Sequence, residues 1–512
     1  MVSPMKIIGV IGSNSTTTYA PLVVHEAHES SVKEEQLVLV EDHTRSAKYL
    51  GVIRRVVRYD PFLLPYRRTA YADNPDLVEH GAAPFGSAYV YLIGTLTNGF
   101  LGEVTLPPNP GSKVFVIERG DSLNVELGKG LNVGRHKYSG IPIPLYAHYL
   151  PYHIAVIGST GTGKSRLVKI LVDEILEKTN FSVIIFDHTG IDYVGFYPES
   201  CVVRSSDIIL EPDIVSELML TRTKLYRERT TYEKYFLFAT VYYLALKTGT
   251  LTPSGQQQLE GFVRASRLPM NMDIQQVLSN LDFNQLMKGL KKGVEWDIDE
   301  FKGALRAVSQ SVGRGRESSA LIRAVISTDL RLGKSFFENL AKRRMHPREV
   351  VEKSLQERLT IVDMSHDFDL VTKRYVISSI LNEVWKKVEE VKGPINMVVA
   401  IDEAHNYASE DAYGSVEDIE KVAREGRKWG YGLILATQRV IDIAPRIRGN
   451  INTVFFSKLQ TVNDFRELAG YVDLGGISGS SLSILGAREF YVAGLMNPLR
   501  VPMLLTVKEV TQ

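Results

Sequence analysis

The sequence predicts an α/β protein whose core is a mainly parallel sheet, interrupted by a helical insertion and preceded by a small N-terminal β-barrel. Three observations predict this fold. From about residue 150 apolar strand-like runs alternate with helical periodicity, 205–355 shows helical spacing alone, and short β-rich runs separated by turn residues precede residue 145. We expect the barrel over 1–145, the core over 146–204 and 356–490, the insertion over 205–355, and a C-terminal brace or tail over 491–512.

The N-terminal region has short β-rich runs and no long helical periodicity, which is typical of a small barrel or sandwich. The expected strands are Lys6–Ile11, Gln36–Val40, Tyr49–Val57, Ala88–Leu96 and Val114–Ile117. The segment Ile141–Pro144 alternates isoleucine and proline, so we expect a stiff connection into the core.

The core begins with a complete phosphate-binding loop. Residues 158–165 read GSTGTGKS and follow the apolar run Tyr152–Ile157, while Ser165–Lys178 has the apolar spacing of a helix. Glycines let backbone N–H groups cradle phosphates, Lys164 can reach the β- and γ-phosphates, and the Ser165 hydroxyl can ligate Mg²⁺. The loop therefore predicts nucleotide binding, and we expect the core to be a RecA-like P-loop ATPase that binds ATP and Mg²⁺. The expected nucleotide-binding residues are Gly158, Ser159, Thr160, Gly161, Thr162, Gly163, Lys164, Ser165 and Arg166.

Four further runs are continuously apolar and end in polar residues, which is typical of buried parallel strands with functional loops at their carboxyl ends. They are Phe181–Asp187, Leu359–Asp363, Ile395–Asp402 and Gly432–Thr437. The third ends in Asp402, followed directly by Glu403. Asp402 suits the Mg²⁺ shell, and Glu403 suits the base that polarises the attacking water. The alternative is a pair of carboxylates that only caps a strand.

The segment Val416–Lys428 is amphipathic and helical and ends in a basic group that contains Arg424 and Arg427. Either arginine can stabilise transition-state charge as an arginine finger, or both can form a solvated helix end that complements the helix dipole. Gln438 follows the next strand, so it is placed to sense the γ-phosphate.

The composition of the whole chain limits the class of protein and the contacts that it can make. The apolar fraction of 44% and charged fraction of 23% are those of a soluble globular protein. The net charge is +1, so any nucleic-acid contact must come from clustered Lys and Arg. The single cysteine, Cys201, excludes intrachain disulfides and multi-cysteine zinc sites and fits a reducing interior. No run approaches the roughly 18 apolar residues of a membrane span, so we expect no membrane contact.

The P-loop, the run INMVVAIDEAHN, the run AREGRKWGYGLILATQR and the preceding β domain together resemble the HerA–FtsK group of hexameric DNA-pumping ATPases, and HerA-like proteins most closely. The resemblance implies a homo-hexameric ring around double-stranded DNA that works as a translocase and helicase in the archaeal cytoplasm. It implies a NurA-like nuclease as partner in DNA end resection, beside an Mre–Rad complex. It also implies that Arg427, or Arg424, acts on the adjacent subunit's nucleotide. The turn Asp187–Tyr193 departs from the group's H-G-E-Y-like pattern, so His188 and Asp192 receive no catalytic duty.

Two basic stretches are candidates for DNA contact, because phosphate neutralisation dominates affinity. Thr221–Lys234 is either a contact surface or a solvated helix face, and Gly313–Arg316, within the basic stretch Lys302–Lys334, is either a phosphate-gripping loop or a turn. No base-reading motif is visible, which suits sequence-independent movement.

Two patterns resemble motifs of other protein classes but do not indicate those classes here. Ser254–Gln258 echoes the signature of ABC-type ATPases but lies far upstream of Asp402, and the tetrapeptide DEAH at 402–405 occurs in RNA helicases, which need a second lobe that 440–512 is too short to hold. Two rival functions stay open. One is a conjugation- or secretion-type motor, and the other is a nucleotide-gated scaffold that recruits a nuclease.

Overall fold

The computed structural model describes residues 5–60, 63, 73–74, 76, 85–119, 125–225, 229–250, 282–312, 319–367 and 369–509. The chain divides into two compact units. The first comprises Met1–Phe181, Glu403–His405 and Ala423–Gln512, and the second comprises Ser182–Asp402 and Asn406–Val422. Each unit is described by itself.

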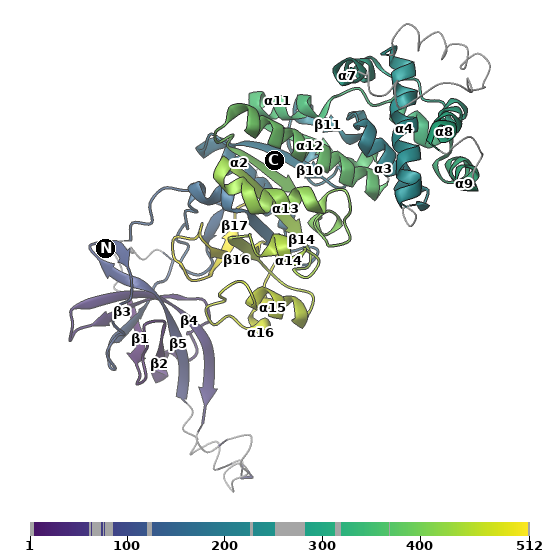
Figure 1. The fold of residues 1–512 in the computed structure, drawn as a ribbon. Coiled ribbons are helices and arrows are strands. Elements are labelled where there is room, and N and C mark those ends of the chain that lie inside the picture. Colours follow the sequence, from purple (N-terminus) through teal and green to yellow (C-terminus); the bar gives the residue numbers. More distant parts are fainter. Residues whose placement is uncertain are drawn as a thin grey trace. The chain divides into compact units, whose positions relative to one another are not determined.

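The first unit begins with a barrel, drawn in purple in Figure 1. Its strands are β1 (Lys6–Ile11), β2 (Tyr19–Val24), β3 (Leu37–Asp42), β4 (Ala47–Tyr59), β5 (Phe85–Thr97), β6 (Phe100–Gly102) and β7 (Lys113–Val116). They run in the order β2-β1-β7-β3-β4-β5-β6, and an additional β2–β5 pairing closes six of them into a barrel. Closure removes the exposed strand edges that would otherwise pair with other chains.

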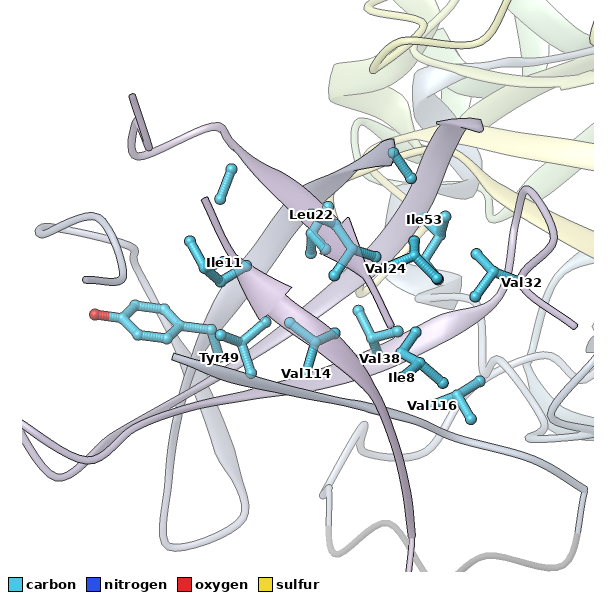
Figure 2. Packing of buried hydrophobic residues seen from close by; sticks show 14 of the residues in the cluster. Ile8, Ile11, Leu22, Val24, Val32, Val38, Tyr49, Ile53, Val114 and Val116 are labelled. Atoms are coloured by element: carbon cyan, nitrogen blue, oxygen red, sulfur yellow. The ribbon is translucent and has the colours of Figure 1, made fainter. Parts of the chain in front are cut away.

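Branched aliphatic side chains fill the barrel. Figure 2 shows Ile8, Leu22, Val38 and Val114 pointing toward one another from β1, β2, β3 and β7. In β2 every second residue is buried, the period expected of a strand with one face on a core. Because of this alternation, one face of β2 packs in the barrel core while the other face points outward.

The rest of the first unit is built on a mixed sheet. Its strands, in spatial order, are β14 (Tyr431–Thr437), β9 (Ile154–Ile157), β15 (Thr453–Phe456), β16 (Glu489–Gly494), β17 (Met503–Val507) and β8 (Gly134–His136). β9 is parallel to both its neighbours, whereas the pairings from β15 to β8 are antiparallel. β8 thus lies inside the range expected for the barrel yet pairs with β17. Within 491–512, β17 lies between β16 and β8 in the sheet.

Helices and helical turns complete the first unit around that sheet. They are η2 (Ala147–Tyr152), α2 (Lys164–Lys178), η10 (Gly426–Trp429), α14 (Pro445–Arg448), α15 (Val462–Ala469) and α16 (Gly479–Ser483). Helix α13 (Val416–Glu425) runs directly into η10, so the expected helix over 416–428 ends in a 3₁₀ turn.

A buried arginine ties the barrel to the rest of the first unit. Arg54, on β4, pairs with Glu35 at 3.0 Å, and both are almost wholly buried. The same guanidinium donates to the carbonyl oxygens of Leu474, Gly475 and Pro502. Its charge is thus fully hydrogen-bonded, which is the condition under which a buried cation is tolerated.

The second unit carries four parallel strands in the order β11 (Val202–Arg204), β12 (Leu359–Asp363), β10 (Ser182–Asp187) and β13 (Met397–Ile401). Helices α11 (Pro347–Glu357) and α12 (Leu370–Val391) accompany them. Every residue of β10, β12 and β13 is buried, which matches their continuous apolar sequence.

The helical part of the second unit lies between β11 and β12 in sequence and is drawn in teal and green in Figure 1. Its helices are α3 (Pro212–Arg222), α4 (Arg229–Thr248), α7 (Phe283–Lys292), α8 (Ile298–Val312), α9 (Ser319–Ser327), the π-helix η7 (Thr328–Leu332) and α10 (Gly333–Ala341). Tyr243 of α4 stacks on Trp296 with ring centroids 5.1 Å apart, and Phe301 and Phe337 join this cluster. Ser254–Gln258 and Gly313–Arg316 lie outside the described residues.

The predicted fold class, a mainly parallel α/β core preceded by a β-barrel, is confirmed. In the described part of the chain no helix is both long and apolar enough to cross a bilayer.

Candidate nucleotide site

The P-loop connects β9 to α2 in the first unit. All four residues of β9 are buried, and α2 begins at Lys164, directly after Gly163. Gly161 and Gly163 have φ of +83° and +96°, a left-handed conformation that glycine adopts without strain. The glycines therefore let the loop turn tightly so that the amino end of α2 faces the site, where its dipole favours phosphate.

Two other segments of the first unit hold the loop. The Ser159 N–H donates to the carbonyl of Lys458, and the Arg488 N–H donates to the carbonyl of Thr162, both at 2.8 Å. The Thr162 hydroxyl donates to the carbonyl of Ser159, also at 2.8 Å. A Cβ on Gly158 would lie 2.7 Å from the Thr162 hydroxyl oxygen, so that position excludes a side chain. The loop is therefore held in its shape by contacts within the first unit.

Gln438 bridges the loop and the candidate base. It follows β14, and its amide nitrogen donates to both oxygens of Glu403 at 3.2 and 3.3 Å. Its amide oxygen accepts the Thr160 hydroxyl at 3.2 Å. The structure thus brings together three residues predicted separately from the P-loop, the 402–403 pair and the strand end.

Glu403 has φ of +45°, a conformation that is strained for a residue with a side chain. Such strain is characteristic of functional positions. His405 Nδ1 lies 3.2 Å from a Glu403 carboxylate oxygen, although the angle between them does not form a hydrogen bond. Sequence reasoning missed His405 as a neighbour of the base. Its signal was its place two residues after Glu403.

Arg427 lies at the opposite edge of the same sheet. β14 and β9 are parallel, with Ile434 opposite Ile154, so Gln438 and the P-loop share the carboxyl edge. Arg427 precedes β14 on η10, and its guanidinium carbon lies 4.2 Å from the ring centroid of Tyr152, which precedes β9. Strands of this length, at roughly 3.3 Å per residue, separate Arg427 from its own P-loop by more than 10 Å. Arg424 is exposed and pairs with Glu425 at 2.9 Å.

Within the second unit, Asp402 follows β13 and is almost fully buried. Its carboxylate lies close enough to those of Asp187 and Asp192 for the three to hold a metal ion. Asp187, however, already accepts the backbone N–H groups of residues 189, 190, 193 and 194, at 2.8 to 3.3 Å. Asp187 therefore shapes the 187–194 loop, and Asp402 and Asp192 are the other two carboxylates of this group.

His188 and Lys373 also serve this loop. His188 Nδ1 lies 2.6 Å from the Tyr407 hydroxyl, and the Lys373 ammonium donates to the His188 carbonyl at 3.0 Å. Burial lowers the pKa of Lys373. These contacts give His188 a structural role.

Parts of the candidate DNA-contact stretches are engaged within the second unit. Arg222 pairs with Asp369 at 3.1 Å and stacks on Phe336, and Lys302 pairs with Asp299 and Asp329 at 2.7 and 2.8 Å. Tyr232 is fully buried. Exposed cations nevertheless remain at Lys234, Arg331 and Lys334.

The chain is similar to known proteins over most of its length. Residues 131–384 match the family model described as the central domain of helicase HerA. The chain is 24% identical to the DNA double-strand break repair helicase HerA of Sulfurisphaera tokodaii, over 80% of this chain and 75% of the relative. It is 23% identical to the protein of the same name from Sulfolobus acidocaldarius, over 98% and 92%. It is also similar to the solved bacterial conjugative coupling protein TrwB, with 15% identity over 75% of this chain and 90% of that one and a TM-score of 0.47.

A P-loop that a strand-end glutamine joins to a glutamate is the arrangement expected of a P-loop ATPase. The chain belongs to the HerA helicase family, and it is an ATPase and helicase of the HerA–FtsK type.

Proposed function

We propose that this protein is an ATP-driven translocase and helicase of double-stranded DNA that works as a homo-hexameric ring in DNA end resection with a NurA-like nuclease, beside an Mre–Rad complex. Its relatives' names, which specify repair of DNA double-strand breaks, support the task. The main support for a ring of subunits is the position of Arg427, which lies at the sheet edge away from its own P-loop. An arginine there completes a nucleotide site only on another copy of the chain.

The residues of the first unit then divide the chemistry of hydrolysis. Lys164 binds the β- and γ-phosphates, and Glu403 takes a proton from the attacking water. Gln438 is hydrogen-bonded to Thr160 and Glu403, so it links the presence of a γ-phosphate to the position of the Glu403 carboxylate. Arg427 of a neighbouring subunit stabilises charge in the transition state, and the exposed Arg424 is the second candidate for this role.

Mg²⁺ fits the oxygen donors that the chain offers. Ser165 lies in the first turn of α2, and the buried Asp402 supplies a carboxylate, with Asp192 nearby. When bound with ATP, Mg²⁺ would neutralise phosphate charge. The chain's own part is to hold these oxygens, Ser165 in the first unit and the two carboxylates in the second.

Displacement of the third strand from a DNA triplex tests the function. The protein with ATP should release the third strand from duplex DNA, and Lys164→Ala should not, because it cannot hold the phosphates. Salt should weaken DNA binding steeply, since contact with phosphates releases counterions.

The same displacement assay, together with ATP hydrolysis measured with and without DNA, distinguishes the rival functions. DNA-stimulated hydrolysis without displacement would favour the scaffold, and hydrolysis that DNA does not stimulate would favour a motor for another polymer. The partner is tested separately, by measuring whether ATP increases digestion of blunt DNA ends when a NurA-like nuclease is added. No increase would remove end resection from the proposal.

A further inference from the structure

Arg488 touches the P-loop from the far end of the chain. It directly precedes β16, and its N–H donates to the carbonyl of Thr162 at 2.8 Å. Its own carbonyl accepts the N–H of Val507, on β17, at 2.9 Å. The backbone of residue 488 is therefore fixed between the P-loop and the last strand.

The conformation of Arg488 favours a different residue type. Its φ is +66°, in the left-handed region where glycine is free of strain and a residue with a Cβ is not. Both backbone hydrogen bonds would be kept by glycine, so the backbone alone does not require an arginine. An outlier of this kind points to a use for the side chain.

The Arg488 side chain begins beside the P-loop. A Cβ built on Gly163 would lie 3.7 Å from Arg488 Cγ, so the side chain starts beside the last residue before α2. The guanidinium then pairs with Glu509 at 2.9 Å. The Arg488 side chain is 32% exposed and that of Glu509 is 83% exposed.

An ion pair with so exposed a carboxylate contributes little, because water screens both charges. A nucleotide phosphate carries more charge than Glu509 and offers a guanidinium paired, planar hydrogen bonds. Phosphate therefore competes well for Arg488, provided that the nucleotide binds at the adjacent loop.

We propose that Arg488 is a nucleotide-binding residue of its own subunit's site, with Glu509 as a resting counter-ion that a phosphate of the bound nucleotide replaces. This rests on the proposed nucleotide site at the P-loop. It adds to that site a cation that no P-loop motif contains.

Equilibrium binding of ADP, measured by calorimetry at constant salt, tests the exchange because the two partners change affinity in opposite directions. Arg488→Gln should weaken binding by about tenfold, the effect of losing one charge-assisted contact of about 1.4 kcal/mol. Glu509→Gln should strengthen binding by about two- to fivefold, since the competing carboxylate is gone. Arg488→Lys should recover part of the loss.

Arg500 and Glu103 supply the matched control. Arg500 also has a left-handed backbone, with φ of +60°, and its exposed side chain lies 3.8 Å from a Glu103 carboxylate oxygen. Arg500→Gln and Glu103→Gln should leave ADP affinity unchanged.

Several outcomes would overturn the proposed role of Arg488 and Glu509. Unchanged or weaker ADP binding by Glu509→Gln would overturn the proposal even if Arg488→Gln misfolds, because the exposed Glu509 can be replaced without disturbing a core. Equal losses in the Arg500 control would also overturn it. If Lys164→Ala abolishes ADP binding while Arg488→Gln does not change it, only the role of Arg488 fails. If Lys164→Ala has no effect, the nucleotide site itself fails.

Discussion

The side-chain amide of Gln438 donates to both carboxylate oxygens of Glu403 while its oxygen accepts the Thr160 hydroxyl. One side chain thus connects the phosphate loop to the carboxylate proposed as base. The two contacts also fix the orientation of the amide, since an exchanged nitrogen and oxygen would leave Glu403 facing an acceptor. A change at the phosphates can reach Glu403 through a single residue.

Glu403→Gln should reduce DNA-stimulated ATP hydrolysis by about 10²–10⁴-fold, because glutamine cannot accept the proton of the attacking water. ADP binding should persist, since the P-loop is held by other contacts. The measurement is steady-state hydrolysis beside ADP affinity. The exposed Glu410→Gln is the control, and near wild-type hydrolysis by Glu403→Gln would remove Glu403 as base.

Gln438→Ala should lower kcat by about ten- to a hundredfold, the cost of losing a hydrogen bond to a charged group. The Michaelis constant for ATP should change less, because the phosphates still meet the P-loop. Thr160→Val should reproduce part of the loss and Thr160→Ser should not, since serine keeps the hydroxyl. Equal kinetics for the valine and serine variants would contradict a role for the Thr160 contact.

Arg427→Ala and Lys164→Ala should each be inactive alone and partly active when mixed. In a mixed ring, the intact P-loop of an Arg427→Ala subunit can meet the intact Arg427 of a Lys164→Ala neighbour. The measurement is ATP hydrolysis after subunit exchange, with the same mixture of Arg424→Ala and Lys164→Ala for comparison. No recovery in well-mixed rings would exclude action across the interface by Arg427.

His153→Asn should make the free energy of unfolding fall less steeply as the pH is lowered into mild acid. Burial lowers the pKa of His153 to about 4, so the unfolded chain binds the proton more tightly. The stability due to the neutral ring is therefore complete above about pH 6.5 and is lost as the pH falls toward 4, by about 3 kcal/mol. Asparagine tolerates the φ of +66° and can replace Nδ1 as acceptor of the Leu433 N–H.

Denaturant unfolding at pH 7, 6 and 5 measures this slope. The exposed His148→Asn serves as the control and should keep the wild-type slope. Burial lowers the pKa of His136 to about 4 as well, so part of the slope should remain in His153→Asn.

Arg54→Leu should lower the free energy of unfolding by about 3–5 kcal/mol, because it leaves the buried Glu35 carboxylate without a counter-charge. Adding Glu35→Leu should recover much of the loss. The surface pair Lys48–Glu41 of the same barrel is the comparison, and Lys48→Leu should cost about 1 kcal/mol or less. Similar losses for Arg54→Leu and Lys48→Leu would show that the buried pair contributes no more than a surface pair.

Local patterns predicted much of this fold. β1 and β12 have the expected bounds, and the P-loop lies between a strand and a helix as its motif requires. The strand β2 was not predicted, because Pro21 interrupts a short run and its partners are set by barrel closure. The strands β15, β16 and β17 were not predicted either, since a four-residue run such as Thr453–Phe456 becomes a strand only beside β9.

The candidate site was predictable where chemistry is encoded in neighbouring residues, as at Lys164 and Glu403. The roles of the catalytic residues remain predictions. Arg488 had no local signal, because its importance lies in a left-handed φ and in a contact with Thr162, more than three hundred positions earlier in the chain. Arg222 was expected as a possible DNA contact, but its partners Asp369 and Phe336 come from distant segments that spacing along the chain does not reveal.

The dependence of the P-loop on Lys458 and Arg488 has a consequence for biosynthesis. A ribosome releases GSTGTGKS long before it makes β14 and β15, the two strands that flank β9. Until those strands emerge, the nascent chain holds the full motif without the framework that shapes it, and such long-range pairing forms late. ATP therefore cannot assist the early folding of this chain. Nucleotide binding instead marks the moment at which its carboxyl-terminal quarter has joined the sheet.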